Sequence, residues 1–178
     1  MENLNQRIAT LRLLRKELHK HPEISGKEVQ TAKRITSFLE NYPPDEMKTG
    51  VGTTGVLAIY SGKKPGKTVL FRCELDALPI EEINTFEHRS VSNGVSHKCG
   101  HDGHMVILCG LAMELHDRRP ETGTVILLFQ PAEEDGTGAA KVSQDPQFTY
   151  KPDFVFALHN IPGYKMNQIV VKNYKNIK

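Results

Sequence analysis

The densest group of chemically active side chains lies between His97 and His104. This segment reads His-Lys-Cys-Gly-His-Asp-Gly-His and places five potential metal ligands within eight positions. Its two glycines let the backbone bend sharply. Thiolate and imidazole groups suit a borderline-soft divalent ion, so the segment indicates a metal site. A polar loop with incidental histidines is the competing interpretation, and the density of ligands argues against it.

A pair of carboxylates, Glu133 and Glu134, follows the apolar run from Thr124 to Phe129. Adjacent acids on a protein surface are usually a solvated charge run. Here they come directly after a strand-like segment, which predicts that they lie at the rim of a sheet. In a metal hydrolase one such carboxylate can ligate the metal, and its neighbour can take a proton from water and deliver it to a leaving amine.

Two further residues follow apolar runs in the same way. His159 comes after Phe154–Leu158, and Asp76 comes after Val69–Phe71. His159 is a candidate ligand, although a structural or capping role explains a single histidine equally well. Asp76 is a candidate for orienting a ligand imidazole, with an ordinary strand-to-loop acid as the alternative.

The elements that must position these residues can be predicted from hydrophobic spacing. Apolar residues at three- to four-residue intervals indicate helices, and short β-branched runs between turn residues indicate strands. We expect helices over 4–19, 26–40 and 105–116, and strands over 55–60, 68–73, 124–129, 154–158 and 169–171. This alternation predicts a layered α/β domain with a mixed, mostly parallel sheet, in which ligands bind at the carboxyl ends of the strands.

Composition excludes several classes of protein. The 178 residues carry 23 basic and 21 acidic side chains, a net charge of +2, which argues against nucleic-acid or membrane-surface binding. The three cysteines cannot form a full disulfide framework, and Cys73 and Cys109 lie in apolar runs typical of inert core thiols. Near the start, His19 and His21 are expected to be structural groups at a helix end. With no signal peptide or spanning segment visible, we predict a cytoplasmic protein.

Five motifs occur in an order that resembles the M20 metallopeptidase superfamily. More narrowly, the sequence resembles the branch of N-acyl-amino-acid amidohydrolases that includes hippurate hydrolases, auxin-conjugate hydrolases and acetyl-diaminopimelate deacetylases. The motifs spread over nearly the whole chain. They are the segments 15–23 (RKELHKHPE), 76–79 (DALP), 99–104 (CGHDGH), 129–134 (FQPAEE) and 158–163 (LHNIPG).

The resemblance implies a role for each matched residue. The family's metal ligands match Cys99, His101, Glu134 and His159. Its general base matches Glu133, and the acid that orients the metal site matches Asp76. The implied fold is a zinc-exopeptidase-like α/β/α layered domain.

The implied reaction is hydrolysis of the amide that joins an acyl group to an amino acid or a short peptide. Two divalent metal ions would polarise the carbonyl and lower the pKa of water. Manganese is the first expectation for these ions, with zinc, nickel or cobalt as alternatives. No nucleic-acid or membrane partner is expected.

The sequence departs from the family in details and in length. Glu74-Leu75-Asp76 replaces the usual Asp-Met-Asp, Lys98 replaces an alanine, and Asp135 follows the glutamate pair. Full members are about twice as long, with a lid domain and a last histidine ligand. We therefore expect residues 1–178 to form a partial catalytic domain, with little or no activity alone.

Three other interpretations stay open. The chain could be one half of a split enzyme that needs a complementing C-terminal chain, or it could act as a homo-oligomer. It could instead be a non-catalytic, metal-binding remnant. A hydrolase that uses Cys99 as a nucleophile beside a histidine is the least favoured, because the converging acids suit a cation better.

Overall fold

The computed structural model describes residues 3–165 and 168–170. Its elements, in chain order, are α1 (Leu4–Lys20), α2 (Val29–Leu39), β1 (Glu46–Val51), β2 (Gly55–Ser61), β3 (Lys64–Glu74), α3 (His101–Asp117), β4 (Thr122–Gln130), α4 (Gly138–Gln144) and β5 (Phe154–Ala157). None of the helices in this part of the chain is long and apolar enough to cross a membrane. The cytoplasmic location stays a prediction.

The first two helices follow the predicted spacing, with one difference. A capping box starts α1: the Asn3 side chain accepts from the backbone N–H of Gln6, whose side chain accepts in return from the Asn3 backbone. The second helix starts at Val29, three residues later than predicted. Gly26 has a φ of +75°, which is incompatible with helix, and its N–H donates to the Glu28 side chain at 2.8 Å.

The five strands form one mixed sheet in the order β1-β2-β4-β3-β5. The pairs β3/β4 and β3/β5 are parallel, whereas β1/β2 and β2/β4 are antiparallel. Helix α3 connects β3 to β4, as parallel neighbours require. The structure confirms the predicted α/β domain. Strand β1 was not predicted, because charged, mostly exposed residues interrupt its apolar pattern.

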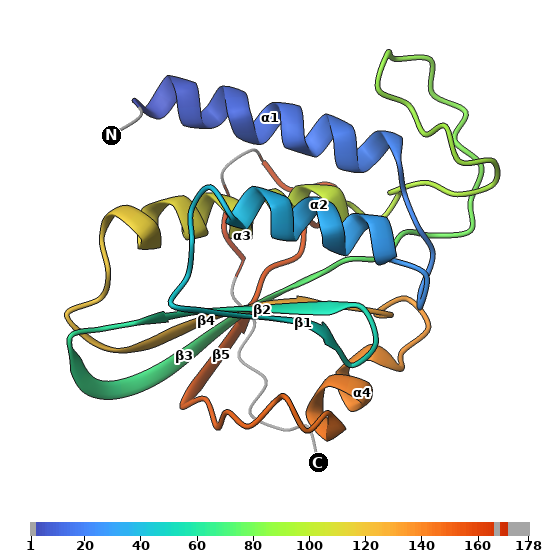
Figure 1. Ribbon diagram of the computed structural model, residues 1–178. Coiled ribbons are helices and arrows are strands. Elements are labelled where there is room, and N and C mark those ends of the chain that lie inside the picture. The colour runs from blue at the N-terminus through green and yellow to red at the C-terminus, as the bar shows by residue number, and fades with distance from the viewer. Residues whose placement is uncertain (1–2, 166–167, 171–178) are drawn as a thin grey trace.

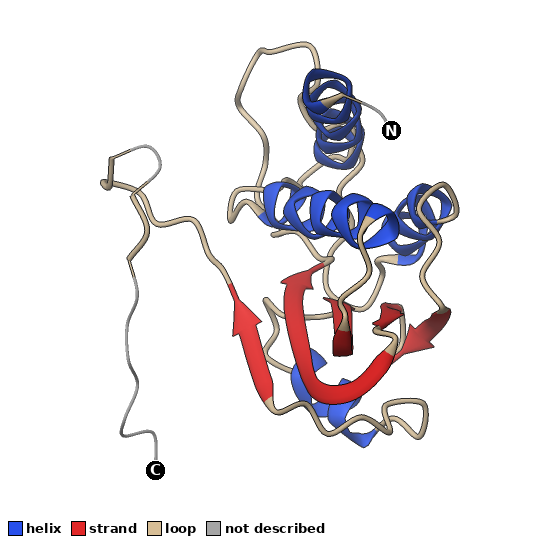
Figure 2. Ribbon diagram, turned by 90° about the vertical axis from the view of Figure 1, so that its left-hand side faces the viewer, coloured by secondary structure: helices blue, strands red, loops and turns tan. Residues whose placement is uncertain are grey.

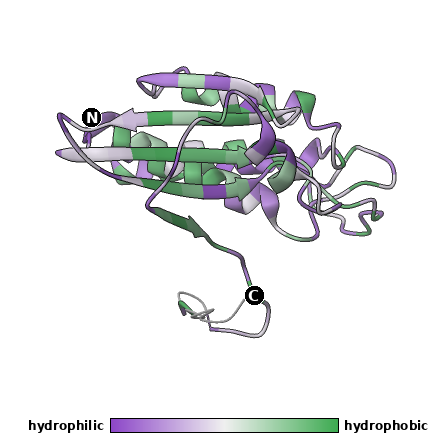
Figure 3. Cartoon of the chain, turned by 90° about the horizontal axis from the view of Figure 1, so that it is seen from below, coloured by the Kyte–Doolittle hydropathy of each residue, from purple (hydrophilic) through white to green (hydrophobic). Residues whose placement is uncertain are grey.

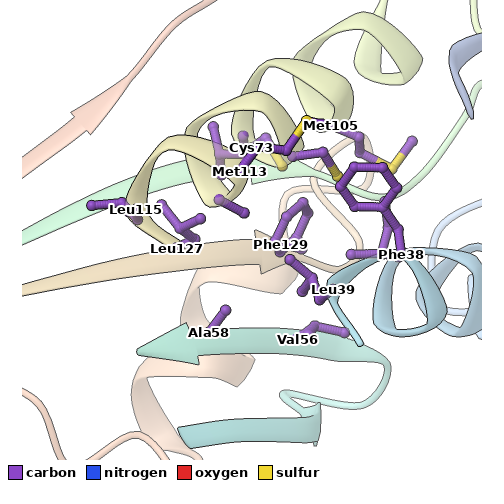
Figure 4. Packing of buried hydrophobic residues seen from close by; sticks show 14 of the residues in the cluster. Phe38, Leu39, Val56, Ala58, Cys73, Met105, Met113, Leu115, Leu127 and Phe129 are labelled. Atoms are coloured by element: carbon purple, nitrogen blue, oxygen red, sulfur yellow. The ribbon is translucent and has the colours of Figure 1, made fainter. Parts of the chain in front are cut away.

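Helices cover the sheet unequally on its two faces. Figure 1 shows α1, α2 and α3 above the sheet and the short α4 below it. A hydrophobic core lies on each face of the sheet, and alternate residues of β4 pack into one or the other. Leu127 and Phe129 pack against the helices, while Ile126 and Leu128 face the side of α4. Figure 4 shows the larger core, where Phe129 lies between α3 and α2. The apolar run of β4 is therefore covered on both faces, as predicted.

Strand β5 forms at the predicted place but is not covered. Phe154, Val155 and Phe156 are 51%, 61% and 52% exposed, and within residues 3–165 and 168–170 β5 pairs with β3 alone. In Figures 2 and 3 it stands at the open edge of the sheet. The predicted strand over 169–171 was wrong for Ile169 and Val170, which are not in a strand, and Val171 lies outside the described residues.

Candidate metal centre

The parallel strands bring the predicted residues to one edge of the sheet. β3 ends at Glu74, β4 at Gln130 and β5 at Ala157, and these strands run in the same direction. Because α3 returns from the end of β3, its first residue, His101, also lies at this edge. Asp76, the glutamate pair and His159 follow within a few residues of these ends. This convergence is the one predicted from the sequence.

Five of the predicted residues form two overlapping donor groups. The donor atoms of Cys99, His101 and His159 all lie within 4.8 Å of one another, and so do those of His101, Glu133 and Glu134. The Cys99 Sγ and His159 Nε2 atoms are 3.3 Å apart. His101 Nε2 is 3.7 Å from Glu134 Oε1 and 3.8 Å from Glu133 Oε2. His101 therefore stands between the two groups.

The hydrogen bonding of His101 leaves a lone pair aimed into this cluster. Its buried Nδ1–H donates to the Asp76 backbone carbonyl at 2.8 Å, which fixes the tautomer and leaves Nε2 as an acceptor. Among the described residues, His101 Nε2 and Glu134 Oε1 are both buried without a hydrogen-bond partner. Two facing acceptors without a donor are costly when buried, unless a cation lies between them. The donor set therefore fits a divalent transition metal.

Asp76 orients the cluster in a way that the sequence did not reveal. The predicted contact to the ligand imidazole comes from its backbone carbonyl, while the nearest carboxylate oxygen is 3.5 Å from His101 Nδ1. The other carboxylate oxygen accepts from the Ser25 hydroxyl at 2.6 Å and from the Glu134 N–H at 2.9 Å. Burial raises the pKa of Asp76, but these donors and His101 outweigh it and leave the pKa lowered. Asp76 thus fixes two of the candidate ligands.

The local electrostatics are negative and favour bound cations. Burial raises the pKa of the Cys99 thiol to about 12, with the carboxylates of Glu134, Glu133 and Glu74 adding to the rise. Burial lowers the pKa of His101, but Asp76 and the charge of Glu74 overcome this effect and raise it. The negative charge that raises both pKa values favours a cation bound between these groups.

The turn that carries the glutamate pair depends on a residue that sequence reasoning missed. Ala132 has a φ of +49°, an unfavourable backbone conformation for a residue with a Cβ. Its N–H donates to the fully buried Glu28 carboxylate at 2.8 Å. No sequence signal links two residues so far apart in the chain. Glu28 holds the bend directly before Glu133.

An α/β domain with a thiolate, imidazoles and carboxylates at its strand ends is typical of metal-dependent hydrolases. The model of peptidase family M20/M25/M40 matches residues 70–174, and the chain belongs to this family. The family match spans β3 to β5 and all the candidate ligands.

Relatives with assigned activities are N-acyl-amino-acid deacetylases. The chain is 35% identical to an N-acetyldiaminopimelate deacetylase of Listeria innocua, over 95% of its own length and 44% of that protein. It is 39% identical to the N-acetylcysteine deacetylase of Bacillus subtilis, over 89% of its own length and 42% of that protein. The chain thus spans less than half the length of the curated relatives it matches.

Solved structures agree with the fold. The YXEP protein of Bacillus subtilis, a dinuclear metal-binding peptidase of the M20 family, superposes with a TM-score of 0.84 at 36% identity, over 90% of this chain and 45% of that one. A putative aminohydrolase from methicillin-resistant Staphylococcus aureus gives a TM-score of 0.76 at 36% identity, over 88% and 44% of the two chains. The binding of two metal ions is described for the YXEP protein.

Proposed function

We propose that the chain forms the metal-binding part of a hydrolase that cleaves the amide bond of N-acyl amino acids. The observation that carries the proposal is two of the three donor groups that share the buried His101; the third, Glu74 with His104, is engaged in hydrogen bonds. The single lone pair of His101 Nε2 can ligate one ion, so a second ion would use the other donors of these groups. The dinuclear metal-binding relative supports two ions, and the relatives that resemble the chain are deacetylases. Substrates would be N-acyl amino acids or short N-acyl peptides.

The proposed roles follow from chemistry and position. Cys99, His101, Glu134 and His159 would hold divalent cations. When bound, such ions polarise a carbonyl oxygen and make water more acidic. Glu133 is partly exposed, with 37% of its side chain accessible, and would take a proton from the attacking water and return it to the leaving amine. We propose manganese as the first candidate ion because the resemblance to the amidohydrolase branch implies it, with zinc, nickel or cobalt as alternatives. The thiolate and imidazole ligands fit a transition metal better than magnesium or calcium.

Residues 1–178 would form a partial catalytic domain that works with a complementing polypeptide. The exposed apolar side chains of β5 and its unpaired edge are suited to accept a further strand. A groove lined by Leu70, Leu128, Val142 and Val155 lies on the same side of the sheet as α4 and is almost wholly apolar. A second copy of the chain on this edge is the alternative outcome.

Reconstitution tests the proposed function. The purified chain would be mixed with the remaining part of a full-length relative, with manganese added, and assayed on N-acetyl and N-benzoyl amino acids. We expect little or no hydrolysis by either part alone and clear hydrolysis by the mixture. Glu133→Gln should abolish activity while metal stays bound, and the exposed control Glu121→Gln should not. An associated but inactive mixture, or an active Glu133→Gln variant, would overturn the proposal.

Two competing functions make different predictions in the same assay. A metal-binding remnant would bind ions and associate, yet give no hydrolysis. A Cys99 nucleophile would give hydrolysis that survives removal of metal. Burial and the neighbouring carboxylates argue against a Cys99 nucleophile, because a thiol whose pKa is raised to about 12 is a poor nucleophile near neutral pH.

A further inference from the structure

The segment that carries His159 is attached to the domain by few contacts. His159 follows the open edge strand and is itself exposed. Among the described residues, its Nε2 contacts Cys99, its Nδ1 donates to the backbone carbonyl of Asn160 at 2.8 Å, and its ring packs against the rings of His101 and His104. A ligand on such a segment needs another group to hold it in place, because loose ligands bind metal weakly.

Asn160 is the point at which this segment meets the core of the domain. Its side-chain Oδ1 is 2.6 Å from His104 Nε2, and its backbone N–H donates to the same nitrogen at 3.3 Å. A Cβ added to Gly100 would lie only 2.5 Å from Oδ1. The absence of a side chain at Gly100 thus gives Asn160 room to reach His104.

The buried carboxylate of Glu74 holds the ring of His104 in place. Its Nδ1 lies 2.8 Å from Glu74 Oε2, and the two side chains are 3% and 1% exposed. A carboxylate only accepts, so Nδ1 carries a proton and donates it, and the Nε2 lone pair accepts from the Asn160 backbone N–H. The Asn160 amide lies against the same nitrogen and donates to it through its NH2 group when the amide is turned so that this group, in place of Oδ1, faces the ring. Arg72 in turn donates to the other Glu74 oxygen at 2.7 Å. The ring of His104 packs edge-on against that of His159, with centroids 4.7 Å apart.

We propose that Glu74, His104 and Asn160 form a positioning chain that presents His159 to the metal centre. It links the end of β3, the first turn of α3 and the segment after β5. None of the three is among the ligands proposed above. The positioning chain acts on metal by presenting His159, and the negative charge of Glu74 also acts directly on Cys99 and His101. The expected effect of these residues on metal affinity rests on the proposed function. Their expected effect on the order of the segment after β5 does not.

Whether Glu74, His104 and Asn160 hold the segment after β5 in place can be tested on the metal-free protein. Hydrogen–deuterium exchange would be followed at the Asn160 amide and its neighbours up to Tyr164 in the full chain. We expect Glu74→Gln and Asn160→Ala to speed exchange there by at least about tenfold, as expected for a lost local hydrogen bond. Asn160→Ala removes only a surface contact and cannot unfold the core. The control Glu87→Gln, on an exposed loop, should leave exchange unchanged, and unchanged exchange in Asn160→Ala would overturn the proposal.

A double-mutant cycle tests the link to metal. Manganese and zinc affinities would be measured by calorimetry for Asn160→Ala, His159→Ala and the double variant. We expect Asn160→Ala, which keeps the charge of Glu74, to weaken binding by about tenfold, and to add nothing once His159 is gone. Losses that multiply would show that Asn160 acts independently of His159 and would overturn the proposal. A wild-type chain that binds neither ion would refute the proposed function, and the exchange experiment would then decide the positioning chain by itself.

Discussion

Replacing Glu28 tests whether one buried carboxylate holds the bend before the glutamate pair. Its Oε1 accepts from the Gly26 and Ala132 backbone N–H groups, both at 2.8 Å, and its Oε2 accepts from the Thr54 hydroxyl at 2.8 Å. Glu28→Ala removes all three bonds, and each donor left unpaired inside the protein costs about 1–3 kcal/mol. The Thr54 hydroxyl and the N–H of the exposed Gly26 can turn to water, at a net cost of about 1 kcal/mol each, whereas the buried Ala132 N–H cannot. We therefore expect a loss of about 3–5 kcal/mol in the free energy of unfolding.

Glu28→Gln separates the hydrogen bonds from the charge. The amide oxygen can keep both backbone bonds, and its NH2 group can donate to Thr54, so the loss should be only about 1–2 kcal/mol. Urea unfolding followed by circular dichroism measures both changes. The exposed Glu40→Ala serves as the control and should stay within about 0.5 kcal/mol of wild type. If Glu28→Ala behaves like this control, the bend before Glu133 does not depend on Glu28.

Two further substitutions, at His19 and at Gly138, test contacts that stabilise other parts of the domain. His19 lies 2.9 Å from both Asp102 and Glu82, which raise its pKa, so its stabilising effect should be complete below the unfolded pKa of about 6.5 and should fade as pH rises through the raised folded value. Unfolding from pH 6 to 9 should show this decline in wild type and a smaller one in a His19→Gln variant. At Gly138 an added Cβ would lie 1.7 Å from the Pro131 carbonyl, so Gly138→Ala should lower the melting temperature by several degrees.

Controls for these changes lie on the same helices or on neighbouring ones. His21→Gln should keep the decline with pH, because His21 is more exposed and pairs only with Glu17 among the described residues. Gly110→Ala in α3 meets only a flexible side-chain end at 3.2 Å and should be tolerated. The charged and titratable groups around His19 are Arg12, Arg15 and Lys16 on α1, Asp102 on α3, and Glu82, His88 and His97 between β3 and α3. A pH profile shared by wild type and His19→Gln would assign the decline to this set instead.

The sequence predicted the elements whose pattern is set by local packing. The apolar run of β4 reflects burial of the strand itself. The apolar spacing of α1 correctly indicated a helix, although Leu18 is buried whereas Leu4 and Ile8 are exposed. Strand β1 lacks this signal, since its residues are mostly exposed. In β5 the apolar run correctly indicated a strand but not its exposure, because burial depends on what lies beside the strand.

The candidate site likewise contains features that the sequence predicted and others that it did not. The ligand types and the strand ends could be predicted, because residue chemistry and the parallel sheet determine them. The supporting contacts could not: Asp76 acts partly through its backbone, and Glu28 reaches a turn more than a hundred residues away. His19 lies at the end of α1, as predicted, yet its two buried carboxylate partners come from distant segments. Such contacts depend on the tertiary fold and leave no periodic pattern.

The central claim is that Cys99 and its neighbouring imidazoles hold a divalent metal ion. X-ray absorption spectroscopy of the zinc-loaded chain tests it most directly. We expect nitrogen and oxygen neighbours together with one sulfur at about 2.3 Å, and loss of that sulfur in Cys99→Ser, with Cys109→Ser as the unchanged control. A spectrum with no sulfur neighbour in wild type, or one that Cys99→Ser leaves unaltered, would contradict the claim.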